Sequence, residues 1–272
     1  MPWVTSGDVD ICWESHGNGE PVLLISGVSG GTWSWEEQLE AWSSRFRLIV
    51  FDHMGAGRSS MPDRPYRIEE MADHAAAVLD SAGEKRAHVV GLSMGGMVAQ
   101  ELSLNHAYRV VSLVLGCTHC GGRNRVPPDP EVIRLFVDNQ GLTPEEIVDK
   151  NLAILVTPEF LQSGEDVLTR YRERQLRAPI QPSYALRRQL EAIRSFDSCD
   201  RIGAIAVPTL ILTGDRDTLV PPENGRLLAS RISGAVEKSF SSSGHLIYLE
   251  SAQQFQETVM RFIQNHSSTL AK

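Results

Sequence analysis

The stretch His88-Val89-Val90-Gly91-Leu92-Ser93-Met94-Gly95-Gly96 carries the strongest indication of both fold and chemistry. An apolar run of β type ends in Gly-x-Ser-x-Gly, and a helical pattern follows at Val98–Leu104. A serine at a sharp strand-to-helix turn stands clear of the sheet, and so tight a turn requires small neighbours such as Gly91 and Gly95. The helix behind it directs N–H groups and its positive end toward a developing oxyanion. We therefore predict that Ser93 is a nucleophile; the alternative is a glycine-rich turn whose serine caps the helix.

Short apolar runs alternate with longer helical patterns, which predicts an α/β fold with a mostly parallel central sheet and helices on both faces. Runs such as Val22-Leu23-Leu24-Ile25 are almost continuously apolar, as expected of strands that are buried on both faces. Ser6-Gly7-Asp8 indicates a tight turn leading into an antiparallel start of the sheet. The expected strands are Val9–Glu14, Val22–Ser26, Leu48–Asp52, His88–Leu92, Val110–Gly116, Thr209–Gly214 and Val236–Phe240.

One long segment breaks this alternation, because no run between Thr118 and about Asp200 is suitable for a strand. A single crossover needs only about a dozen residues, so a helical insertion of about eighty predicts a lid over the sheet edge. We therefore expect a core made of residues 1–117 and 201–272, with residues 118–200 as a helical lid inserted after the sixth strand. Its expected helices are Val132–Asn139, Glu145–Leu155 (after a capping box at Thr143-Pro144-Glu145-Glu146), Glu165–Arg177 and Ser183–Arg194.

The composition limits the class of protein. The 272 residues include 26 Lys and Arg against 34 Asp and Glu, a formal charge of −8, which argues against nucleic-acid or anionic-membrane partners. Four cysteines are too few and too scattered for a disulfide scaffold. The first residues lack a signal-peptide pattern, and no apolar run approaches the roughly 18 residues that span a bilayer. We therefore expect a cytoplasmic globular protein that binds a small molecule, without nucleic-acid or membrane partners.

A nucleophilic serine needs a base near pKa 7 to take its proton. Among the eight histidines, His245 alone follows a late strand by a short Ser/Gly turn, which suits a ring that lies over the nucleophile. The imidazole in turn needs a buried carboxylate that fixes its tautomer. Asp215 and Asp217 lie two residues apart at the end of an expected strand, and either could supply it. Asp52 also follows a strand end.

With these residues, the chain resembles the α/β-hydrolase family over nearly its whole length. Phe51–Ser59 is similar to the family's D-x-x-G-x-G-x-S loop, Thr213–Pro221 to its acid loop and Ser243-Gly244-His245 to its histidine loop. The order Ser, Asp, His is the chain order of the family. Within the family the chain looks most like the lid-bearing esterases and enol-lactonases.

The resemblance implies a role for each carboxylate. The family's G-x-x-D form, applied at Gly214, makes Asp217 the acid of the triad and leaves Asp215 as a turn residue. The loop that contains Asp52 is structural in the family rather than catalytic. The expected catalytic residues are therefore Ser93, Asp217 and His245.

The resemblance also places an oxyanion hole. Its donors would be the backbone N–H groups of Met94 and of Val28, which lies in the loop after an early buried strand. The residue before the first glycine of this loop is usually histidine, and here it is Ser26. The loop is thus expected to lack one polar support, while the donor itself is retained; a plain glycine-rich turn is the alternative.

Weaker patterns concern metals, cofactors and the substrate pocket. Cys117-Thr118-His119-Cys120 contains C-x-x-C and a histidine, but no second ligand pair has matching spacing, so we expect no metal and place His119 at the pocket. The glycines of the oxyanion loop do not form a dinucleotide fingerprint, so we expect no cofactor. Arg123 and Arg125 flank the lid entrance and either attract a substrate carboxylate or are simply solvated. Trp33 is a candidate pocket wall, with core packing as the alternative.

The sequence thus predicts a cofactor-free serine hydrolase that cleaves a carboxylic ester or lactone through an acyl-enzyme on Ser93. Family members that use an Asp nucleophile, the haloalkane dehalogenases and epoxide hydrolases, do not fit this serine. We expect a neutral substrate, because the net negative charge repels anions. The alternatives are another reaction on the same triad (perhydrolysis, C–C hydrolysis, or hydrolysis of a carboxylate-bearing enol-lactone) and a low-turnover receptor.

Overall fold

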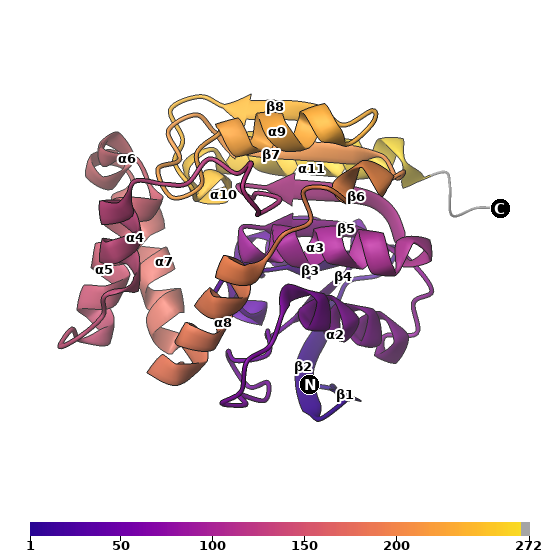
Figure 1. Cartoon of the computed structure of the whole chain (residues 1–272), viewed down its shortest axis with the longest axis horizontal. Helices are drawn as coiled ribbons and strands as arrows, with labels where there is room; N and C mark the ends of the chain where they lie inside the picture. Colours follow the sequence, from indigo (N-terminus) through magenta and orange to yellow (C-terminus); the bar gives the residue numbers. More distant parts are fainter. Residues whose placement is uncertain (268–272) are drawn as a thin grey trace.

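The computed structural model describes residues 1–267 and contains an eight-stranded sheet in the order β1-β2-β4-β3-β5-β6-β7-β8 (Figure 1). β2 pairs antiparallel with both β1 and β4, and the pairs from β4 to β8 are parallel. This confirms the expected α/β-hydrolase fold. The strands are β1 (Trp3–Ser6), β2 (Val9–His16), β3 (Glu20–Ile25), β4 (Phe46–Phe51), β5 (Ala87–Leu92), β6 (Val110–Gly116), β7 (Thr209–Gly214) and β8 (Val236–Phe240).

Each of the seven expected strands is present, with ends that shift by at most a few residues. The strand that the sequence did not show is β1, which pairs with β2 across the expected turn, with Val4 opposite Ile11. β1 lies at the edge of the sheet, and its residues alternate between exposed and half-buried. It therefore lacks the apolar run by which the buried strands were recognised.

Two helical layers bury the two faces of the sheet. In β3, Leu23 and Ile25 pack in one core with α2 and α3, while Leu24 packs in the other with Trp42 of α1 and Phe255 of α11. Both sets are fully buried, which explains the continuous apolar run of this strand. The core helices are α1 (Glu36–Trp42), α2 (Ile68–Ser81), α3 (Met94–Asn105), α9 (Glu223–Arg231), α10 (Ile247–Glu250) and α11 (Ala252–Asn265), with short 3-10 turns at η1 (Thr32–Trp35), η2 (Ala107–Arg109) and η3 (Ile202–Ala204).

Five helices lie between β6 and β7 and stand beside one end of the sheet (Figure 1); we call this group the lid, after the expectation for this segment. Four of them were expected, and the capping box is confirmed: Thr143 Oγ1 accepts from Glu146 N, and Glu146 Oε2 accepts from Thr143 N. The short fifth, α6, was not recognised, because six residues offer little helical periodicity. The lid helices are α4 (Pro130–Val137), α5 (Pro144–Leu155), α6 (Pro158–Ser163), α7 (Glu165–Arg177) and α8 (Ser183–Ser195).

A disulfide closes the base of the lid. Cys120 and Cys199 are bonded across a sequence separation of 79, and beside them Gly121 and Asp197 form an isolated antiparallel bridge. The sequence did not indicate this pairing, which joins the two stems of the insertion. No helix in the described part of the chain combines the length and the apolar character that a bilayer crossing needs.

Candidate active site

Ser93 lies at the turn between β5 and α3, with φ 55° and ψ −122°. A non-glycine residue in this region of φ is strained by about 1–3 kcal/mol and persists only where its surroundings hold it. Three hydrogen bonds do so: Ser93 N donates to Gly116 O (2.8 Å), while Gly96 N (2.9 Å) and Thr118 Oγ1 (2.8 Å) donate to Ser93 O. The backbone of the candidate nucleophile is therefore fixed from β6 and from its own helix.

The two glycines that flank Ser93 are required by close backbone approach. A Cβ atom at Gly95 would lie 2.1 Å from Ile25 O, and one at Gly91 would lie 2.3 Å from Gly95 O. Because backbone cannot move away without disrupting β3 or the turn, neither position admits a side chain. The helix α3 thus approaches β3 closely, and the turn presents Ser93 beside the loop that follows β3.

His245 and Asp217 form a buried pair. Their exposed fractions are 7% and 4%, and His245 Nδ1–H donates to Asp217 Oδ2 at 2.7 Å. The other carboxylate oxygen, Oδ1, accepts from the backbone N–H groups of Leu219 (2.9 Å) and Val220 (2.8 Å). Asp215 is exposed and accepts from Ser243 N instead. The structure therefore brings Asp217, and not Asp215, to the imidazole, and leaves Nε2 of His245 available as a base.

The lid holds the histidine loop in place. Leu155 O, at the end of α5, accepts from His245 N (2.8 Å) and Leu246 N (3.1 Å). Glu250 Oε1 accepts from Gly244 N (2.7 Å), and its Oε2 accepts from Thr157 N (2.9 Å) in the lid. Nothing in the local sequence around Glu250 had indicated this role, since its partners lie in the lid and in the histidine loop.

Cys117, at the end of β6, is a buried thiol beside this pair. Its Sγ, a carboxylate oxygen of Asp217 and a ring nitrogen of His245 all lie within 4.8 Å of one another, a grouping that can hold a metal ion. The donor set does not favour a cation: Nδ1 of His245 and both oxygens of Asp217 are engaged in hydrogen bonds. Burial, reinforced by the nearby Asp217 charge, also raises the pKa of the Cys117 thiol well above its usual value, which disfavours the thiolate that metals bind.

The loop after β3 carries Val28, and Val28 lines the same cavity as Ser93. Met94 is the first residue of α3, where a backbone N–H has no partner within the helix. His53 Nε2–H donates to Ser26 O at 2.7 Å, and burial lowers the pKa of His53 to about 4, so the ring is neutral near pH 7. His53 was not assigned from the sequence; it supplies from the loop after β4 the polar support that the absence of a histidine at position 26 seemed to remove.

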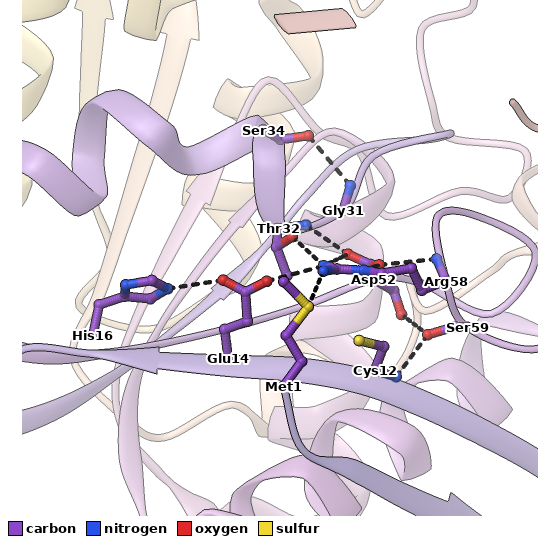
Figure 2. Close-up of polar contacts among 10 residues, drawn as sticks. All are labelled: Met1, Cys12, Glu14, His16, Gly31, Thr32, Ser34, Asp52, Arg58 and Ser59. Carbon is purple, nitrogen blue, oxygen red and sulfur yellow. Dashed lines mark hydrogen bonds and ion pairs between the residues drawn. The ribbon is translucent and has the colours of Figure 1, made fainter. Parts of the chain in front are cut away.

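Asp52 holds the segments after β3 and β4 together and is not among the residues that line the cavity. Figure 2 shows its fully buried carboxylate between Arg58 and Thr32. Oδ1 accepts from Thr32 N (2.9 Å), and Oδ2 accepts from Arg58 N (2.9 Å) and Arg58 Nε (2.8 Å). Ser59 Oγ donates to Asp52 O (2.6 Å) and accepts from Cys12 N (2.9 Å), which ties the loop to β2 (Figure 2). These contacts give Asp52 a structural position that joins the segments after β3 and β4.

A cavity of about 350 Å³ lies between the sheet and the lid, and Ser93 and His245 both line it. Trp33 and Trp35 belong to the lining, as do Phe136, Leu186 and other apolar residues of the lid. Within residues 1–267, the side chains that line this cavity include no Asp, Glu, Lys or Arg. The pocket is therefore lined by apolar side chains together with uncharged polar ones, among them Asn139, Asn151 and Gln175.

Three residues that the sequence placed at the pocket lie elsewhere. His119, Arg123 and Arg125 are not among the residues that line the cavity, which corrects that expectation. The ring of His119 faces Phe196 and accepts at Nδ1 from Gly121 N (3.0 Å), so the histidine packs against the lid stem. Arg123 is exposed and Arg125 half-buried, and the adjacent Val126 is hydrogen-bonded through its N–H and its carbonyl to Asn224 of α9.

Comparisons with known proteins agree with the fold. A family model described as alpha/beta hydrolase fold matches residues 20–252. The chain is 34% identical to a protein of Azorhizobium caulinodans named "Putative carbamate hydrolase RutD", over 96% of this chain and 98% of that protein. It is 30% identical to the poly(3-hydroxyalkanoate) depolymerase of Ectopseudomonas oleovorans, over 90% and 84% of the two chains. The crystal structure of the enol-lactonase from Burkholderia xenovorans LB400 is similar with a TM-score of 0.84 and 26% identity, over 97% of this chain and all of the other.

Proposed function

This chain belongs to the α/β-hydrolase family and is a hydrolase of that fold, and from that premise we propose that it is a serine hydrolase that cleaves a neutral, apolar carboxylic ester or lactone. The observation that carries the proposal is the cavity above Ser93 and His245, whose lining includes no Asp, Glu, Lys or Arg in the described part of the chain. The partner that the proposal requires is a small molecule, with no nucleic acid, membrane or cofactor taking part.

The proposed reaction uses the triad in two stages. Ser93 Oγ attacks the substrate carbonyl while His245 Nε2 takes the serine proton, and the N–H groups of Met94 and Val28 stabilise the oxyanion. Collapse of the tetrahedral intermediate breaks the ester C–O bond, and His245 gives its proton to the leaving alkoxide. A water molecule then attacks the acyl carbon while His245 takes its proton; the bond between the acyl carbon and Ser93 Oγ breaks, and His245 returns the proton to Ser93 Oγ as the carboxylic acid leaves. Asp217 keeps the proton of the imidazole on Nδ1 throughout and stabilises the imidazolium.

The lining supports a neutral substrate on energetic grounds. A buried carboxylate without a cationic partner is costly, and the cavity wall offers no Lys or Arg within residues 1–267 to pair with it. Leu186, Leu190 and Phe136 instead offer aliphatic and aromatic surface, which favours an apolar acyl or alcohol group by about 25 cal/mol per Å² buried. A volume of about 350 Å³ is of the size that takes a small organic molecule.

The names of the relatives cover several acyl substrates. One relative is named for carbamate hydrolysis, another for cleavage of a polyester, and a structural neighbour for an enol-lactone. A serine triad can attack the carbonyl of each, so the triad does not separate them. A carbamate ester is uncharged and compatible with the lining, whereas a free carbamate anion meets the same cost as a carboxylate.

The test compares kcat/KM for a neutral aryl ester, the matching carbamate ester and the ω-carboxylate analogue of the ester. We expect kcat/KM for the neutral ester to be at least about tenfold higher than for the ω-carboxylate, since a desolvation cost of only about 1.4 kcal/mol for the carboxylate gives that ratio. The double variant Arg123→Ala/Arg125→Ala should leave the ratio unchanged, because both side chains lie outside the cavity. Ile180 lines the cavity and is 85% exposed, so Ile180→Arg offers a cation to the carboxylate and should reduce the ratio of the two kcat/KM values.

Two results would contradict the proposal. A carboxylate preference of about tenfold that disappears in the Arg123/Arg125 double variant would assign an anionic substrate to the lid entrance. Wild-type protein that reacts once with each ester and then stops would indicate a receptor rather than an enzyme. Preferential turnover of the carbamate ester would keep the mechanism and change the substrate class.

A further inference from the structure

Lid helix α8 reaches across the cavity edge to the loop that carries the expected oxyanion donor. Gln189, on α8, is fully buried, and its Oε1 accepts from Ser29 N at 2.9 Å. Its Nε2 donates to Met54 O at 2.9 Å, in the loop after β4. The orientation of this amide is determined by its partners, because the opposite flip would place an NH₂ group against the N–H of Ser29 and an oxygen against the carbonyl of Met54.

A second lid glutamine extends the contact. Gln181 Nε2 donates to Gly55 O (2.7 Å) and to Gln189 Oε1 (3.1 Å), and Ser29 Oγ donates to Gln181 Oε1 (2.6 Å). The backbone N–H and the hydroxyl of Ser29 are thus both bound to the lid. Ser29 directly follows Val28, so the N–H of Ser29 lies one peptide beyond the N–H of Val28, the candidate oxyanion donor.

The loop is held at both ends by polar groups from outside it. His53 binds Ser26 O from the core, and Gln189 binds Ser29 N from the lid, while Gly27 and Val28 lie between these two attachments. The N–H of Val28 must point at the position of the oxyanion to within a fraction of an ångström for a full effect on rate. The attachment at Ser29 N holds the peptide that follows Val28, and so restrains the preceding peptide, which carries the N–H of Val28, through the two backbone dihedrals of Val28.

We propose that Gln189 is a positioning residue, by which the lid sets the oxyanion loop in its catalytic geometry. In this proposal α8 orients the Val28 peptide through Gln189. The lid makes a similar contact with the histidine loop, where Leu155 O at the end of α5 accepts from His245 N. The inference rests on the proposed serine mechanism, although it does not depend on which ester is the substrate.

The test uses two readouts on the same variants. The first is kcat and KM with the neutral ester, and the second is the rate at which a small alkyl fluorophosphonate modifies Ser93. In that modification Ser93 Oγ bonds to phosphorus, the P–F bond breaks, fluoride leaves and His245 takes the serine proton. The phosphoryl oxygen then occupies the position of the oxyanion, so the rate reports on the loop even when no turnover substrate is known.

Three variants separate positioning from general loosening of the lid. Gln189→Leu conserves the approximate volume and removes the three hydrogen bonds of the amide, to Ser29 N, Gln181 Nε2 and Met54 O. Gln181→Ala removes the bonds to Ser29 Oγ and Gly55 O at a half-buried position. Tyr184→Phe is the matched control, because Tyr184 is also on α8 and donates to Met61 O (3.0 Å), away from the oxyanion loop.

We expect Gln189→Leu to lower both kcat and the phosphonylation rate by about 100-fold with KM within about threefold of wild type. Gln181→Ala should show a smaller decrease of the same kind, and Tyr184→Phe should match wild type. The proposal is overturned if Gln189→Leu reacts within about threefold of wild type, if it changes KM alone, or if Tyr184→Phe is equally slow.

Two further outcomes remain decisive. Should Gln189→Leu not fold, as judged by circular dichroism, Gln181→Ala decides: a lower phosphonylation rate than that of Tyr184→Phe supports positioning, and an equal rate overturns it. Should wild type be phosphonylated without hydrolysing any neutral ester, the proposed substrate is wrong, while the comparison of phosphonylation rates still tests the role of Gln189.

Discussion

Replacement of Asp217 by asparagine tests the triad most directly, because the surrounding hydrogen bonds dictate how the new side chain must lie. Oδ1 of Asp217 accepts from Leu219 N and Val220 N at 2.9 and 2.8 Å. In Asp217→Asn the single amide oxygen must take that position, since an NH₂ group there would face two N–H donors. The NH₂ group therefore faces Nδ1 of His245, which must then accept a hydrogen bond and carry its proton on Nε2.

An imidazole protonated on Nε2 cannot take the proton of Ser93. This tautomer effect lowers the rate by about 10⁴ in a serine triad, which corresponds to about 5.4 kcal/mol of activation free energy at 1.36 kcal/mol per tenfold. The fold should tolerate the change, because asparagine conserves the shape of the side chain and both backbone hydrogen bonds. Asp217→Asn is therefore expected to lower activity far more than it lowers the free energy of unfolding.

The assay is kcat/KM for the neutral ester together with the fluorophosphonate reaction rate, on wild type, Asp217→Asn and the matched control Asp215→Asn. Asp215 is exposed and binds Ser243 N, so its variant should retain activity to within about tenfold. An Asp217→Asn protein that keeps a tenth of wild-type activity, or an Asp215→Asn protein that loses as much as Asp217→Asn, would refute the assignment of the acid.

Three other predictions concern the nucleophile, pH and the disulfide. Ser93→Ala should lower kcat by roughly 10⁴–10⁶ and abolish fluorophosphonate labelling while circular dichroism is unchanged; labelling at another residue would exclude this serine. Burial lowers the pKa of both His88 and His119 to about 4, against about 6.5 in an unfolded chain, so the unfolded state binds more protons between these values. The free energy of unfolding should therefore fall as pH is lowered from about 6.5 to about 4, and His88→Gln should reduce that slope by up to about 1.4 kcal/mol per pH unit; an unchanged slope in urea titrations would contradict the effect. Joint replacement of Cys120 and Cys199 by alanine should lower the free energy of unfolding under oxidising conditions by up to about 4.5 kcal/mol, and wild type should lose the same amount when reduced.

The sequence by itself determined the features that are written in contiguous residues. The buried strands are visible as apolar runs, the lid helices as periodic patterns with a capping box, and the turn at Ser93 as glycines on both sides of a serine. Each of these signals depends on local conformational preference and on burial of neighbouring residues, so no knowledge of distant contacts is needed to detect it. The edge strand Trp3–Ser6 was missed because its four residues contain no apolar run.

The tertiary structure decided how distant residues meet at the site. Asp215 and Asp217 were both possible by position and the family resemblance chose Asp217, while the direction of the chain after β7 is what places Oδ2 of Asp217 2.7 Å from Nδ1 of His245. The contact between Ser29 and Gln189 spans 160 positions, and the disulfide between Cys120 and Cys199 spans 79. Such contacts, like the absence of Asp, Glu, Lys and Arg from the cavity lining within residues 1–267, depend on the side-chain directions that result when helices pack on a sheet. A one-dimensional pattern encodes which face of an element is buried, but not which atom of another element it meets.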